Sequence, residues 1–152
     1  MAFIEYNDID IIALTQNLEA DAKPLWGQMN GRQMIEHLVL TMRISLGIVP
    51  VEVVTRQENL VRARAFLASD KHLPRYVKAP LYEDDELPEF EFDSIKTAIL
   101  VLAGLLSRFE DHFRKNDDVE YNHPIFGSLG FQDWKRFHEK HFTHHLSQFS
   151  LI

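Results

Sequence analysis

The sequence predicts an all-α protein, built as a four-helix bundle with a long irregular connection between the second and third helices. Two observations lead to this fold class: four segments repeat apolar residues at helical spacing, and no strands alternate with them. The chain has 152 residues, of which 45% are hydrophobic, so it can bury the core of one domain. We therefore expect residues 1–152 to form a single domain.

The first two helices are marked by periodicity and by a start signal. Residues 8–18 place apolar side chains on one stripe, and Pro24 follows shortly after them. A second helix is expected to begin at Asn30, because Asn30 and Gln33 have the spacing of a capping box. It should run to about Leu46.

The last two helices carry the longest periodic patterns. The third begins at Asp93 or Ser94 and continues through Phe113, with apolar residues every three or four positions over about five turns. The fourth covers residues 131–149 and begins after Gly130, which stands where a Ser or Thr cap is usual. Its apolar face is interrupted by histidines.

The region between the second and third helices is less regular. Residues 57–68 are expected to form a shorter amphipathic helix, whereas residues 48–54 are too few and too apolar to assign. Residues 83–93 hold seven acidic side chains and no basic one, next to prolines, which predicts a solvated connection.

Composition excludes several functions. The net charge of −7 has the wrong sign for attraction to nucleic acid or to anionic membrane lipids, so neither is an expected partner. The absence of cysteine rules out disulfides, thiolate metal sites and a cysteine nucleophile. Because residues 1–10 have no basic start and the longest apolar run has nine residues, a cytoplasmic protein is expected.

Histidines are the chemical signal in this chain, and four of the eight lie in the last predicted helix. His141 and His145 are four positions apart, about 40° in projection and about 6 Å along the axis, so both rings can reach one point. This is the spacing of a metal-chelating pair. His144 points about 100° away from His145 and is interpreted as a histidine at the rim or in solvent.

A stable metal site needs at least a third ligand. His37 is the best candidate, because it lies close to the apolar face of the second helix. His138 points inward too, and is either a rival ligand or a buried hydrogen-bond donor to a ligand. Three inward histidines with this spacing predict a site for a divalent metal ion; imidazole suits zinc, nickel and iron alike.

Two further residues have open interpretations. His123 precedes the last helix, where it either lines the mouth of a pocket or belongs to a turn fixed by Pro124 and Gly127. Gln148 lies one turn after His145, where it either orients a metal ligand or covers polar surface. We assign no general base from the sequence.

The arrangement resembles the DinB-like superfamily, four-helix bundles with one metal-binding histidine on the second helix and a His-x-x-x-His pair on the last. Residues 26–29 and 33–38 look like that superfamily's second-helix region, and residues 141–148 look like its His-x-x-x-His-x-x-Gln end. The His-Pro-x-Phe-Gly loop at residues 123–127 and the His-His-Leu-x-Gln-Phe end at residues 144–149 resemble one branch whose activity is not assigned.

The resemblance implies His37, His141 and His145 as metal ligands, in agreement with the helical angles. Some superfamily members are S-transferases that use low-molecular-weight thiols, and others are described as metal-dependent hydrolases. We therefore expect a metal-dependent enzyme whose partner is a small-molecule substrate, with a low-molecular-weight thiol as one candidate. The alternative is a non-catalytic bundle with a structural or vestigial metal that acts by association. A homodimer is also expected, because twofold dimers are the commonest oligomers.

Overall fold

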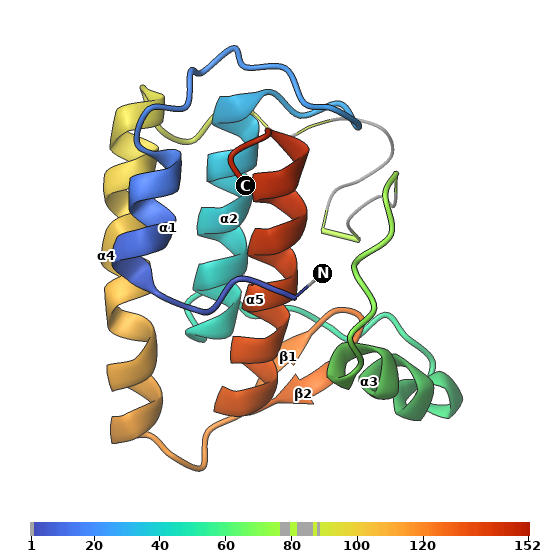
Figure 1. The fold of residues 1–152 in the computed structure, drawn as a ribbon. Helices are drawn as coiled ribbons and strands as arrows, with labels where there is room; N and C mark the ends of the chain where they lie inside the picture. Colours follow the sequence, from blue (N-terminus) through green and yellow to red (C-terminus); the bar gives the residue numbers. More distant parts are fainter. Residues whose placement is uncertain (1, 77–79, 82–86, 88) are drawn as a thin grey trace.

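The computed structural model describes residues 2–76, 80–81, 87 and 89–152. Within these residues it contains five α-helices, one short 3-10 helix and one antiparallel sheet of two strands. The expectation of an all-α four-helix bundle is therefore wrong. Helices α1, α2, α4 and α5 lie side by side, whereas α3 and the two strands gather near the beginning of α5 (Figure 1).

The first two helices begin where the sequence predicts. Helix α1 spans Asp8–Thr15, and its preceding Asn7 accepts a hydrogen bond from the Asp10 amide; the helix ends three residues earlier than expected. Helix α2 spans Gly31–Ser45. Asn30 and Gln33 form the predicted capping box, in which each side chain accepts a bond from the other's backbone amide, at 2.9 and 2.8 Å. These caps satisfy amides that the first helical turn leaves unpaired.

The two longest helices also match their predicted ranges. Helix α4 spans Ile95–Lys115 and is capped by Ser94, whose hydroxyl accepts a bond from the Thr97 amide. Helix α5 spans Phe131–Gln148 and begins after Gly130, with no side-chain cap. The apolar faces of α2, α4 and α5 supply most of the core.

A short hairpin between α4 and α5 is the element that the sequence analysis missed. Strands β1 (Tyr121–His123) and β2 (Gly127–Leu129) pair in antiparallel fashion, with Asn122 opposite Ser128. Three residues are too few to show strand periodicity, so the segment was expected to be only a loop or a turn. The indole Nε1 of Trp134 on α5 donates to the Tyr121 carbonyl at 3.2 Å and ties the hairpin to α5.

The connection between α2 and α4 includes the predicted short helix. It consists of the 3-10 helix η1 (Gln57–Asn59) followed by α3 (Leu60–Ala68), which packs against α5. Residues 83–86 and 88 of the predicted acidic connection lie outside the described residues. At its end, Glu91 forms an ion pair with Arg43 of α2 at 2.8 Å, so this part of the segment contacts the helices.

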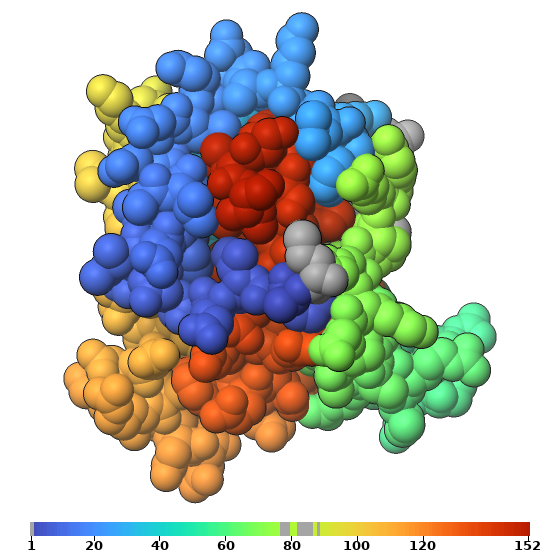
Figure 2. Space-filling view, in the orientation of Figure 1, coloured from blue at the N-terminus to red at the C-terminus, as the bar shows by residue number. Residues whose placement is uncertain are grey.

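The N-terminal segment lies across the outer side of α5 and covers its middle turns (Figure 2). The Ile4 amide donates to the Thr143 hydroxyl at 3.0 Å, and the Tyr6 amide donates to the Glu139 carboxylate at 2.8 Å. This segment therefore holds α5 in place from the side opposite His141 and His145. In the described part of the chain, no helix has the length and apolar character needed to cross a membrane.

Candidate metal centre

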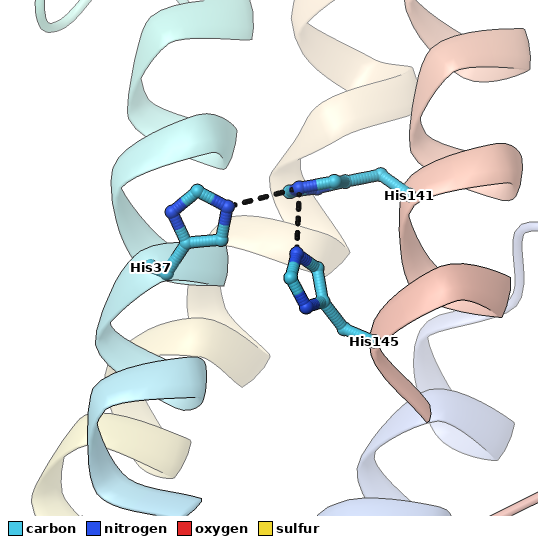
Figure 3. A group of neighbouring side chains, drawn as sticks. All are labelled: His37, His141 and His145. Carbon is cyan, nitrogen blue, oxygen red and sulfur yellow. Dashed lines mark hydrogen bonds between the residues drawn. The ribbon is translucent and has the colours of Figure 1, made fainter. Parts of the chain in front are cut away.

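Three histidine rings from two helices converge in the interior. His37 comes from α2, and His141 and His145 come from α5 (Figure 3). The Nε2 atom of His141 lies 3.0 Å from Nε2 of His37 and 3.0 Å from Nε2 of His145. All three side chains are buried, with exposed fractions of 5 to 6%. The structure thus brings together the three residues singled out from the sequence.

The local fold explains this convergence. Residues four apart on a helix lie one above the other, so His141 and His145 present their rings to the same side of α5. Helix α2 packs beside α5 and turns its buried face, which includes His37, toward that side. The ring of Phe137, one turn before His141, stacks on the His141 ring with centroids 4.9 Å apart and limits its rotation.

Gln148 fixes the proton position on His145. Its amide nitrogen donates to the Trp26 carbonyl at 2.9 Å, so its Oε1 faces the His145 ring. This oxygen lies 2.7 Å from Nδ1 of His145 and can only accept, so Nδ1 carries the proton. The Nε2 atom of a neutral His145 then keeps its lone pair, as a metal ligand must.

Burial keeps these rings neutral. Loss of hydration lowers the pKa of His37 from 6.5 to about 4, with a smaller contribution from His144. It also lowers the pKa values of His141 and His145 well below 6.5, and the neighbouring histidines lower both further. All three imidazoles are therefore in the unprotonated state that binds metal at neutral pH.

Hydrogen bonding alone does not satisfy the cluster. If His141 Nε2 carries a proton, it donates to one neighbour; if it does not, it faces the lone pair of His145. In either case only one of the two 3.0 Å contacts of His141 Nε2 can be a normal hydrogen bond. Metal–nitrogen bonds of about 2.0–2.1 Å, at angles between about 90° and 110°, separate ligand nitrogens by about 2.8–3.4 Å. The donor set therefore fits a divalent metal ion, and the three ligand atoms all lie within 4.8 Å of one another.

His138 does not belong to this group of three. It is fully buried between aromatic rings, and its Nε2 lies 2.8 Å from the Ser45 hydroxyl. Burial lowers its pKa to about 3, so it is a neutral core residue. Its interpretation as a rival ligand therefore finds no support, nor does it donate to a ligand among the described residues.

A large cavity borders the histidine cluster. Its volume is about 1130 Å³, and the three histidines lie in its wall together with His123, His144 and Gln148. The rest of the described wall comes from α3 and the segments on either side of it, the hairpin turn and the loop before α2, and most of these residues are apolar. The described residues that line it include no aspartate or glutamate. No fourth histidine, cysteine or carboxylate joins the three ligand atoms in the described part of the chain.

His123 combines the two interpretations that the sequence left open. Its Nδ1 accepts bonds from the amides of Ile125 and Phe126, at 3.0 and 3.3 Å, and so shapes the hairpin turn. The residue also lines the cavity. His144 lies at the cavity wall too, half-buried and edge-on to Trp26, and is absent from the ligand group.

Sequence reasoning missed several residues that shape the site. Phe66 of α3 and the Trp26 backbone contribute to the cavity and to the orientation of Gln148, yet no spacing rule connects them with α5. The signal for Phe137 was available, because it lies one turn before His141 on the same face of α5.

Fold and site together define a mainly helical protein with a buried three-histidine cluster open to a cavity. The family model of a protein of unknown function, DUF1569, matches residues 5–151, and the chain belongs to this family. No curated protein and no solved structure matches it.

Proposed function

We propose that this protein is a metal-dependent enzyme that acts on a small molecule, by thiol S-transfer or by hydrolysis. His37, His141 and His145 are its metal ligands. The observation that carries the proposal is the position of the three nitrogens in the wall of a cavity of about 1130 Å³. Structural metal sites are usually closed by four protein ligands, whereas catalytic sites keep one coordination position for water or substrate.

A divalent ion held by three neutral imidazoles supplies either a bound water whose pKa falls from about 15.7 toward 7, or a site that holds a thiol as thiolate. Gln148, through its bond to Nδ1, would leave the His145 Nε2 lone pair free to bind the ion. Phe137 holds the His141 ring by stacking. The apolar walls exclude water around a bound substrate, which strengthens electrostatic interactions at the site.

The resemblance to the DinB-like superfamily supports both reaction classes, because its members include thiol S-transferases and proteins described as hydrolases. The described residues of the cavity wall include no carboxylate that could act as a general base. Both reactions agree with this finding, since metal coordination itself favours the ionised nucleophile. The size of the cavity fits an organic substrate of drug-like dimensions.

The proposal is tested on protein purified without a histidine tag. Metal analysis should find about one divalent ion per chain, and the zinc-, nickel- and iron-loaded forms should be screened for thiol transfer and ester hydrolysis. His145→Ala should abolish any activity found, while His144→Ala serves as the matched neighbour. A loaded protein with no turnover in either screen, and no exchangeable ligand on the metal, would favour the non-catalytic alternative.

Three expectations from the sequence remain predictions. We propose one domain over residues 1–152, a homodimer and a cytoplasmic location. A molecular mass in solution that stays at one chain over a wide concentration range would argue against the dimer.

A further inference from the structure

We propose that His123 is a substrate-binding residue: its Nε2–H group donates a hydrogen bond into the cavity, to a carbonyl or carboxylate oxygen of an otherwise apolar organic molecule. The proposal deepens the proposed function and rests on it only in assigning this molecule as the substrate. Its binding part stands on the geometry of the hairpin turn and the cavity wall.

The hairpin turn determines which nitrogen of His123 carries the proton. Two backbone amides, of Ile125 and Phe126, donate to Nδ1, so Nδ1 has a lone pair and no proton. The proton of the neutral ring must then be on Nε2. Burial lowers the pKa of His123 to about 3, so the ring stays neutral across the physiological range.

The donor at Nε2 is left for a ligand. The His123 side chain is only 8% exposed, and it lines the cavity that also contains the three clustered histidines. Within the described part of the chain, both hydrogen bonds of this ring involve Nδ1, and Nε2 has none. This nitrogen is not among the buried side-chain atoms that lack a partner, so solvent or a ligand can reach it and accept its bond. Its orientation is fixed in advance, so little entropy is lost when it binds an acceptor.

The neighbours of His123 define the rest of the ligand. Its ring contacts Phe126, Trp134 and Phe137, with centroids 4.7, 5.4 and 4.3 Å away. Phe137 also stacks on His141, so one aromatic ring links His123 to the histidine cluster. A molecule that fills this space has an apolar body against the aromatic wall and an oxygen at His123.

Charge on the described part of the cavity wall favours an acceptor over a cation. Arg62 and Lys71 contribute to the wall, and none of the described lining residues is acidic. A ligand ammonium group at His123 would face an N–H donor. A carboxylate or carbonyl oxygen meets groups of the right polarity.

The first experiment compares two probes with the same carbon number, 4-phenylbutyrate and 4-phenylbutylamine, by calorimetry with metal-free and zinc-loaded protein. We expect the carboxylate to bind at least about tenfold more tightly than the amine, because a hydrogen bond to a charged acceptor contributes about that factor or more. His123→Leu should lose about tenfold in carboxylate affinity. His123→Gln, which keeps an acceptor for the turn and a donor for the cavity, should retain most of it.

Ser128→Ala is the control variant on the same hairpin, outside the cavity wall, and should change the affinity of both probes only slightly. A loss of carboxylate preference in Arg62→Gln that equals or exceeds that in His123→Leu would overturn the proposal. So would equal affinity for the two probes in the wild-type protein.

The second experiment needs no substitution in the turn. Proton–nitrogen correlation spectra of ring-labelled histidines should show His123 as the Nε2–H form in the free protein, and 4-phenylbutyrate should shift this proton signal. An Nδ1–H form, or a signal unchanged at saturation, would refute the assignment. If the histidine cluster fails to bind metal, the proposed function is wrong. The role of His123 is still tested, because both probes are also measured with the metal-free protein.

Discussion

Replacing Gln148 by leucine tests how the protein orients the candidate metal ligand His145. The substitution removes the 2.7 Å bond from His145 Nδ1 and the 2.9 Å bond to the Trp26 carbonyl. Loss of a hydrogen bond that orients a metal-binding histidine typically lowers metal affinity about 10- to 100-fold, which corresponds to about 1.4–2.7 kcal/mol. The buried N–H of His145 and the Trp26 carbonyl also lose their partner, so the metal-free protein should lose about 1–3 kcal/mol of stability.

The two effects are measured separately. Zinc affinity is obtained by competition with a chromophoric chelator, and the free energy of unfolding by urea titration in the presence of EDTA. Gln148→Glu still accepts from His145 but cannot donate to Trp26, so it should keep most of the zinc affinity while losing stability. Ser147→Ala, at the adjacent half-exposed position, should change neither quantity. Equal zinc affinity in Gln148→Leu and wild type would refute the orienting role.

Three more predictions follow from the same geometry. Alanine at His37, His141 or His145 should lower zinc occupancy sharply, whereas His144→Ala should leave most of it. Metal analysis of the four purified variants measures this, and equal retention in all four would exclude the site. The metal-free protein should become less stable as the pH falls from 7 to 4, because burial lowers the folded pKa of His138 to about 3, while the unfolded ring binds a proton near 6.5. The loss attributable to His138 is at most about 1.4 kcal/mol per pH unit, and urea titrations of His138→Gln should show a shallower pH dependence; an unchanged slope would contradict this origin. Gly47→Ala should destabilise the fold strongly, since Gly47 has φ +73° and its added Cβ would lie 2.3 Å from the Tyr121 ring; a thermal midpoint equal to that of wild type would contradict this packing.

Local signals in the sequence were enough for the long helices and for the histidine cluster. The capping box at Asn30 and Gln33 depends on residues three apart, and it forms as predicted. The angle between His141 and His145 follows from helix geometry alone, and His37 could be selected because it lies near the apolar stripe of its helix. Each of these inferences uses one helix at a time.

Features that depend on several elements could not be predicted in this way. The hairpin forms from two strands of three residues, which are too short to carry a period, and it is held partly by the indole of Trp134 on another element. The place of His138 is decided by Ser45 on α2, a partner 93 positions away. The cavity arises where α3 and the hairpin turn pack near the histidine-bearing faces of α2 and α5. The periodicity of a single helix does not predict such contacts between elements.

The position of the candidate ligands on two helices has a consequence for folding. His37 and His141 are 104 positions apart, so an ion bound to both closes a loop that contains most of the chain. By the chain-entropy argument used for disulfides, a cross-link over about 100 residues stabilises the folded state by about 4–5 kcal/mol. In this chain, which has no cysteine, a bound metal ion would provide the long-range cross-link that disulfides provide in other small proteins. Metal supply would then set how long the folded protein survives proteolysis, whether or not substrate is present.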